Sequence, residues 1–361
     1  SGWRLTLDDG TDFYSDVILL LPGTPDTNMY TALKEHEKYI HSPWPSSEMM
    51  RKISPDDEVA ILGSGLSAID AVMTLADHKH KGPVTMYSPD GLLPRVQPVK
   101  ESSYSCQYLT PQTVHRTARK KLRGITIKDL YRLYRKDVTV LSGQDFKHRN
   151  SVRDGHAAKE LLEQDIATAE KGGDALMQVV YATRDYSSAI WLMLTDSEKK
   201  TFADGLASYW AINRHAMPLP NAQRLLELFK DEQLHVRPFL NDVQFDHEKK
   251  AFRLSSDGQD HVADVVVNAV GTSASVKKME SALVGNLLKS GLVCEAKSGG
   301  ISIDPFTMQV IDVKGQTGTM YTAGHLANGI LLDVNAVWFN VRTIDTLCGH
   351  LTGHIERKVY G

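Results

Sequence analysis

The stretch EVAILGSGLSAIDAVMTLADHKHKGPVTMYSPDGLLPR, residues 58–95, decides the fold class of this chain. Val59 to Leu62 form a short apolar run that predicts a buried strand, and Leu66 to Ala76 carry apolar residues at helical spacing. A second strand is expected at Val84 to Tyr87. A G-x-G-x-x-A pattern that begins at Gly63 lies between the first strand and the helix. Such a β-α-β unit is the setting that the dinucleotide-binding fingerprint requires.

The turn itself supplies the predicted nucleotide contacts. A first glycine permits the tight turn, and a second lets backbone amides approach a pyrophosphate at the positive end of the helix. The predicted contacts are Gly63, Ser64, Gly65, Leu66 and Ser67. A purely structural β-α-β turn is the alternative.

The end of the second strand normally contacts the adenosine ribose. Asp90 is placed to bond a 2′-hydroxyl, which favours NADH. Ser88 with Arg95 is instead suited to a 2′-phosphate, which favours NADPH. A Pro-Asp-Gly turn without a ligand role explains the same residues equally well.

One phrase occurs twice in the chain, as DVILLLPGT at residues 16–24 and as DVVVNAVGT at residues 264–272. A hairpin pattern precedes each copy, with an Asp-Gly turn in both. The apolar run Val17 to Leu21 predicts a strand that is buried on both faces, as in a parallel sheet. Residues 22–57, rich in proline, serine and charge, are expected to be a connector.

The middle of the chain is expected to be helical. Residues 127–138 follow helical spacing, with Thr126 and Asp129 placed as an N-cap pair. Further helical stretches are expected at about 157–181 and 196–213.

After residue 234 the β pattern returns, and a final strand and helix close the chain. The strand is expected at Met320 to Ala323, and Asn335 is expected to cap the helix. The apolar face of that helix is expected to consist of Val337, Trp338, Val341, Ile344 and Leu347.

This order of elements resembles the flavoproteins with two dinucleotide-binding domains. GSGLSAIDAVMTL, YSPDGLLPR and YWAINRHAMP look most like the FAD-NAD(P)-binding oxidoreductases that carry a helical insertion. The resemblance implies an α/β fold: a Rossmann-like NAD(P) domain with a helical insertion, plus partial FAD-domain segments from both chain ends. The implied domains are the end of an FAD-type domain at 1–27, a linker at 28–57, an NAD(P)-binding domain at 58–275 with the insertion at about 100–235, and the C-terminal part of the FAD-type domain at 276–361.

In that family the first doubled phrase ends an FAD domain whose glycine-rich turn precedes it, and no such turn occurs upstream of residue 16. Three alternatives follow: the chain is a portion of a longer protein, a second chain supplies the FAD pyrophosphate site, or FAD binding has been lost. FAD binding by this chain alone is therefore an open question.

The resemblance also implies which residues pass the flavin. They are Gly324, His325, Asn328, Asp333 and Asn335, and Gly271 and Thr272 are further expected cofactor contacts. A role as scaffolding alone is the alternative for each of them.

The segment NRHAMP offers the candidates for chemistry. Arg214 and His215 are suited to orient an anionic substrate or to exchange a proton near neutral pH. A structural Arg-His pair at the C-terminus of a helix is the competing interpretation.

Composition excludes several classes of function. With 41 basic and 44 acidic residues the chain shows no excess charge for nucleic acid, and its longest apolar run is too short to cross a membrane. Three widely spaced cysteines do not form a disulfide framework or a zinc cluster, and His350 with His354 makes no metal site by itself. A cytoplasmic protein is expected.

The leading hypothesis is a flavin-linked NAD(P)H-dependent oxidoreductase, a reductase or monooxygenase, that acts on a small-molecule substrate with NAD(P)H and FAD as cofactors. The alternative is a non-catalytic or partner-dependent dinucleotide-binding subunit of a split flavoprotein. A flavin-free NAD(P) dehydrogenase is the third possibility, which the doubled phrase disfavours.

Overall fold

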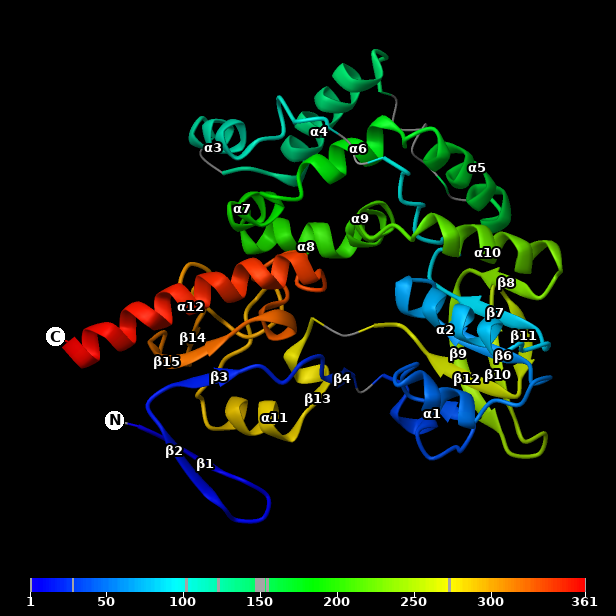
Figure 1. Ribbon diagram of the computed structural model, residues 1–361, viewed down its shortest axis with the longest axis horizontal. Helices are drawn as coiled ribbons and strands as arrows, with labels where there is room; N and C mark the ends of the chain where they lie inside the picture. The colour runs from blue at the N-terminus through cyan, green and yellow to red at the C-terminus, as the bar shows by residue number, and fades with distance from the viewer. Residues whose placement is uncertain are drawn as a thin grey trace.

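The structure is a computed structural model that describes residues 2–27, 29–100, 103–121, 124–146, 153, 156–271 and 274–360. The predicted β-α-β unit is part of a parallel sheet with the strand order β5-β12-β6-β7-β8 (Figure 1). These strands are β5 (Tyr39–Ile40), β12 (Val265–Asn268), β6 (Val59–Leu62), β7 (Val84–Tyr87) and β8 (Leu234–Arg237). β6 leads into α2 (Leu66–Asp77), and β7 pairs with β6 in parallel. The segment expected to be a connector contributes β5 to this sheet and also forms α1 (Ser46–Arg51).

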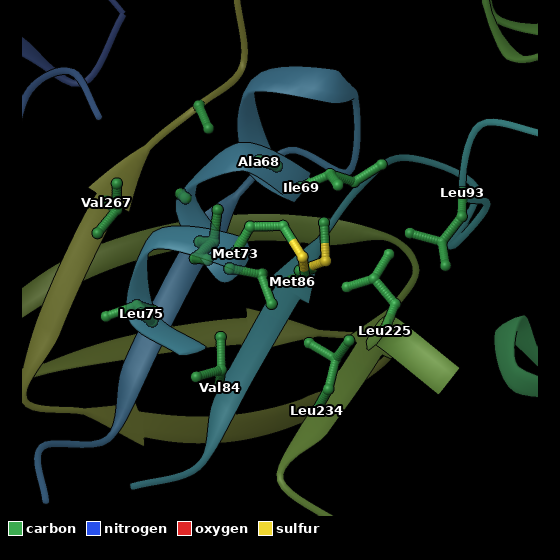
Figure 2. Close-up of a cluster of buried hydrophobic side chains, with 14 of the residues drawn as sticks. Ala68, Ile69, Met73, Leu75, Val84, Met86, Leu93, Leu225, Leu234 and Val267 are labelled. Carbon is green, nitrogen blue, oxygen red and sulfur yellow. The ribbon is translucent and has the colours of Figure 1, made fainter. Parts of the chain in front are cut away.

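Helices cover one face of the parallel sheet and strands cover the other. Figure 2 shows Met73 of α2 and Leu225 of α10 (Leu219–Lys230) beside Met86 of β7 in one buried cluster. The opposite face carries the antiparallel strands β9 (Leu240–Asp246), β10 (Ala251–Ser256) and β11 (Gln259–Ala263). From β10, Phe252 packs in a second cluster with Leu62 of β6. The central strands are thus apolar throughout because both faces are covered.

The helical insertion follows β7. Its helices are α3 (Pro111–Arg119), α4 (Ile127–Ser142), α5 (Ala158–Glu170), α6 (Ala175–Ala182), α7 (Ser187–Leu192), α8 (Asp196–Gly205) and α9 (Ala207–Arg214). Thr126 and Asp129 form the capping box of α4, as predicted. In Figure 1 the insertion lies above both the parallel sheet and the C-terminal segment.

Two of the expected helical stretches are each divided. Gly172 and Gly173 have positive φ angles, which end α5 and separate it from α6 within the expected stretch 157–181. The stretch 196–213 is interrupted at Leu206, where α8 ends and α9 begins. Apolar spacing alone did not reveal either break.

The two ends of the chain meet in a separate sheet with the order β14-β15-β3. It contains β14 (Gln309–Ile311), β15 (Thr317–Thr322) and β3 (Ile18–Leu20); the predicted N-terminal hairpin is β1 (Trp3–Thr6) with β2 (Asp12–Ser15). The remaining elements are β4 (Asp26–Thr27), which pairs with β13 (Met279–Glu280), then α11 (Ala282–Lys289) and α12 (Val337–Tyr360). β15 pairs with β3 in parallel, and Thr322 Oγ1 donates to the carbonyl oxygen of Leu20 at 2.7 Å. β15, near the C-terminus, and β3, near the N-terminus, therefore belong to the same sheet.

The expectation that the strand at Val17 to Leu21 is buried on both faces was wrong. β3 is the edge of its sheet; Leu19 in its middle and Leu21 directly after it are 48% and 50% exposed. The apolar run predicts a covered strand, but no described element covers this side of β3.

The predicted apolar face of the last helix was wrong in part. Val337, Val341 and Ile344 are exposed, whereas Leu347 is buried and Trp338 packs against the same cluster, as predicted. Phe339, which was not predicted, also faces the core. α12 carries apolar residues on two sides, so its sequence does not reveal which side packs inward. No helix in the described part of the chain is both long and apolar enough to span a bilayer.

Candidate functional site

The glycine turn between β6 and α2 has an open side. Gly63 adopts a φ of +111°, and a Cβ atom there would lie 2.6 Å from the carbonyl oxygen of Ala269, so only glycine fits. By contrast, a Cβ atom on Gly65 would meet no heavy atom within 4 Å. Gly65 is the N-cap of α2, so no capping side chain covers the amides of the first helical turn. An anion fits this position, because the helix N-terminus presents N–H donors and a positive dipole end.

The other predicted residues of the turn differ in their surroundings. Ser64 is buried, and its Oγ donates to the carbonyl oxygen of Leu92 at 2.6 Å, which ties the turn to the loop after β7. Leu66 is exposed and Ser67 is half-buried at the start of α2. The open surface of the turn thus consists mainly of Gly65 and the first residues of α2.

The residues after β7 do not form the predicted phosphate site. Arg95 is buried and donates to Asp165 at 3.3 Å and to Asp174 at 2.6 Å. Burial opposes its charge, yet these two carboxylates raise the pKa of Arg95 above its ordinary value. Ser88 is also buried, and its Oγ accepts from the amide of Gly91 at 3.0 Å. We therefore leave Arg95 and Ser88 out of the proposed site.

Asp90 remains a candidate at this end of the sheet. It is half-buried, and its Oδ2 accepts from Ser208 Oγ of α9 at 2.7 Å. Its Oδ1 accepts from the amide of Leu92 at 3.3 Å. Asp90 thus lies between the parallel sheet and the helical insertion.

The remaining residues that were expected to contact a cofactor lie between the regular strands and α-helices. Gly271 follows β12 and is exposed with a φ of +80°, and Thr272 lies outside the described residues. Gly324 has a φ of +73° and open space at its Cβ position. It begins a 3₁₀ helix that includes His325, and burial lowers the pKa of His325.

Two more of these residues lie between that 3₁₀ helix and α12. The carbonyl oxygen of Asn328 lies 2.4 Å from where a Cβ atom on Gly300 would be, so the loop packs closely there. Asn335 is exposed and lies one residue before the N-cap position of α12, so it does not cap this helix as predicted.

The buried carboxylate of Asp333 joins the helical insertion to the C-terminal segment. Its side chain is 1% exposed, and its Oδ2 accepts from Arg214 at 3.2 Å and from Ser187 Oγ at 2.9 Å. Asp333 holds a φ of +65°, an uncommon backbone conformation for an aspartate. α7 adds two further contacts: Ser188 Oγ donates to Leu332 O at 3.1 Å and Trp191 Nε1 to Gly329 O at 2.9 Å. We call Asp333, Arg214 and Ser187 the Asp333 node.

His215 lies beside this node. Its Nε2 is 3.8 Å from Asp333 Oδ1, and neither of these buried atoms has a hydrogen-bond partner in the described part of the chain. Burial lowers the pKa of His215; Asp333 opposes this effect and Arg214 adds to it. His215 is therefore a neutral imidazole near pH 7, able to accept a proton.

Three arginines contact the ring of Trp338, a tryptophan at the start of α12. The guanidinium groups of Arg214, Arg342 and Arg184 lie 5.2, 5.5 and 5.7 Å from the centre of the Trp338 ring. Arg342 is paired with Asp185 at 2.6 Å, whereas no carboxylate pairs with Arg184 among the described residues. These distances are typical of cation–π contacts.

The predicted residues fall into two groups in the structure. Arg214 and His215 lie close to Asp333, which is distant from them in the sequence, whereas the glycine turn lies on the parallel sheet. Sequence reasoning missed Ser187 and Trp338. A serine in a helix and a tryptophan on a half-apolar helix carry no local signal of such contacts.

No protein-family model matches the sequence, and a search of curated proteins finds no match. Solved structures do match. The ornithine hydroxylase of Pseudomonas aeruginosa aligns with a TM-score of 0.52 at 12% identity, covering 98% of this chain and 67% of that chain. The L-lysine 6-monooxygenase of Pseudomonas syringae gives 0.52 at 14% identity over 99% of this chain and 67% of its own. The FAD-bound cadaverine monooxygenase of Erwinia amylovora gives 0.51 at 13% identity over 98% and 65%.

These similarities show the fold. The chain has the α/β architecture of these monooxygenases: a Rossmann-like domain with a helical insertion, together with a smaller sheet built from both chain ends. It spans about two thirds of the length of each of these proteins.

Substitution of Asp333 by asparagine tests the node. The change leaves the charge of Arg214 buried without its carboxylate, so the free energy of unfolding should fall by about 3 kcal/mol in denaturant titrations. Asn tolerates the positive φ angle at this position, so the effect reports the charge. Asp185→Asn, in the exposed pair with Arg342, is the matched control and should change stability little. Equal stabilities for the two variants would contradict the assignment.

The lowered pKa of His215 predicts a pH dependence of stability. As the pH falls through about 6.5, the unfolded chain takes up the histidine proton before the folded chain does. Stability is therefore highest above that pH and decreases as the pH falls below it. His215→Gln should show a smaller loss than the wild type between pH 7 and pH 5. His80 and His325 also have lowered pKa values, so the difference between the two curves is the measurement. Parallel curves would refute the prediction.

Proposed function

We propose that this chain is a flavin-linked NAD(P)H-dependent oxidoreductase, a reductase or monooxygenase, that acts on a small molecule. One observation carries the proposal: no atom of the described residues lies within 4 Å of the Cβ position at Gly65, at the uncapped N-terminus of α2. Known structures of this fold include hydroxylases of ornithine and lysine, which favours the monooxygenase alternative.

The residues at this turn are suited to hold a dinucleotide. The amides of Leu66 and Ser67 would bind the pyrophosphate, and Gly65 leaves room for it. Asp90 would accept from a ribose hydroxyl. When bound, the nicotinamide supplies a hydride and the flavin passes electrons to the substrate or to oxygen.

The loops at the C-terminal ends of β12 and β15 are proposed to face the flavin. Gly324 offers open space, and the unpaired Oδ1 of Asp333 offers a buried acceptor. Gly271, Thr272, His325, Asn328 and Asn335 complete this proposed surface. His215, neutral and next to the node, would hold or receive a proton at Nε2.

The domain limits belong to the same proposal. Residues 58–275 would form the NAD(P)-binding domain with its helical insertion, and residues 276–361 would join 1–27 in the FAD-type part. Residues 28–57 would link the two parts.

A second candidate is a partner-dependent subunit, and the edge strand β3 favours it. β3 has a neighbour on one side only, with Leu19 and Leu21 exposed next to the open edge. The described residues before β6 contain no β-α-β unit that could bind a second pyrophosphate. A further polypeptide segment that pairs with the open edge of β3 and packs on its exposed face would bury these leucines and would complete the FAD site.

A pair of glycine variants tests the nucleotide site. Gly65→Ala places a methyl group in the open space, so its affinity for NAD(P)H should fall about ten-fold while stability stays close to wild type. Gly63→Ala is the contrasting variant, because its methyl group collides with the carbonyl oxygen of Ala269 and should lower the melting temperature. Calorimetric titration and thermal unfolding measure the two effects. Unchanged affinity in Gly65→Ala would refute this site.

Flavin spectroscopy tests the reaction. The chain, reconstituted with FAD, should absorb at about 450 nm and bleach when NAD(P)H is added without oxygen. If the chain binds NAD(P)H but stays colourless until a second polypeptide is supplied, the partner-dependent candidate replaces the first. If it binds neither cofactor, both candidates fail.

A further inference from the structure

The helical insertion encloses a cavity of about 460 Å³. Residues of α4, α6, α7, α8 and α9 line it, and almost all of them are apolar or aromatic. Trp191, Phe202 and Trp210 form one wall, with ring centres 5.3 and 6.2 Å apart in edge-to-face geometry. Protein interiors rarely leave apolar voids of this size, and the volume lies within the range of small-molecule sites.

The charged residues that line the cavity already have protein partners. They are Asp90 and Arg153. Arg153 donates to both carboxylate oxygens of Asp165 at 3.0 and 2.7 Å, and Asp90 accepts from Ser208. Because most of the lining is apolar or aromatic, a charged molecule would lose its water without full compensation, which favours an uncharged one.

Two buried donors of the lining residues have no acceptor within the described residues: Nε of Arg153 and the indole Nε1 of Trp210. The other guanidinium nitrogens of Arg153 already bond Asp165, whereas Nε1 is the only donor of the Trp210 side chain. Buried tryptophan N–H groups usually bond an acceptor, and an unmet donor is costly. A ligand that brings one acceptor oxygen would satisfy this atom.

The position of the cavity connects it with the candidate site. Ser187, a member of the Asp333 node, lines the cavity, as does Leu332 on the neighbouring loop. Asp90, next to the proposed nucleotide site, also lines it. The cavity therefore extends between the parts of the chain that would hold the two cofactors.

We propose that this cavity binds an uncharged molecule with one or two aromatic or apolar rings and one hydrogen-bond acceptor. Its rings would pack against the aromatic wall, and its acceptor would bond Trp210 Nε1. That this molecule is also the substrate rests on the proposed function, whereas binding itself does not.

Binding of 6-propionyl-2-(dimethylamino)naphthalene tests the proposal. This neutral probe has two fused rings and one carbonyl oxygen, and its emission shifts to shorter wavelength in an apolar site. The wild-type chain should give a saturable shift with one site per chain. Leu130→Trp, on the cavity side of α4, should weaken binding at least ten-fold by filling the space. Val140→Trp, at an exposed position of the same helix, should bind as wild type.

A second comparison tests the acceptor. Trp210→Phe keeps the ring wall but removes the N–H donor, so it should bind the carbonyl probe about five-fold more weakly. It should bind 2-(dimethylamino)naphthalene, which lacks the carbonyl group, as the wild type does. Equal losses for the two probes would overturn the role of Trp210.

The outcomes separate this proposal from the proposed function. If Leu130→Trp does not fold by circular dichroism, Val180→Phe, from the α6 side of the cavity, takes its place. A wild-type chain without a saturable shift, or filled variants that bind as wild type, would overturn the cavity assignment. Bleaching of the flavin by NAD(P)H is measured separately in the wild-type chain and in Val140→Trp, where it should be unchanged, so failure of either proposal is recognised without the other.

Discussion

The buried ion pair between Asp333 and Arg214 holds the two halves of this chain in one arrangement. Both side chains are nearly inaccessible to water, and such a pair is stable only when attraction and further hydrogen bonds offset the loss of solvation. Ser187 supplies one of these bonds, and α7 adds contacts to the loop before α12. The helical insertion is therefore fixed against the C-terminal segment, and both His215 and the aromatic cavity adjoin this contact.

Local patterns predicted the elements that local physics determines. The turn at Gly63 follows from a steric requirement, since a side chain there would collide with the neighbouring strand. The capping box at Thr126 is a contact between residues three apart. The resemblance implied that segments from both chain ends come together, and β3 and β15 do pair in one sheet over a separation of about 300 residues.

Other expectations failed because they depended on what covers an element. The side of α12 that packs inward and the exposure of Leu19 are decided by neighbours distant in the sequence. Arg95 has the charge and the hydrogen-bond donors of a phosphate ligand, yet it is paired with Asp165 and Asp174 from the insertion. Ser187 meets Asp333 across 146 residues, and no spacing rule connects them. The site was thus predictable where it is a backbone turn and unpredictable where it is a set of side-chain contacts.

The proposed function rests on a dinucleotide site at the start of α2, beside Gly65. Hydrogen–deuterium exchange with and without NADPH is the most direct measurement of that site. Amides of residues 63–68 should exchange more slowly when NADPH is present, since the bound pyrophosphate would accept their hydrogen bonds. Binding of NADPH that protects other segments but leaves these amides unchanged would contradict it.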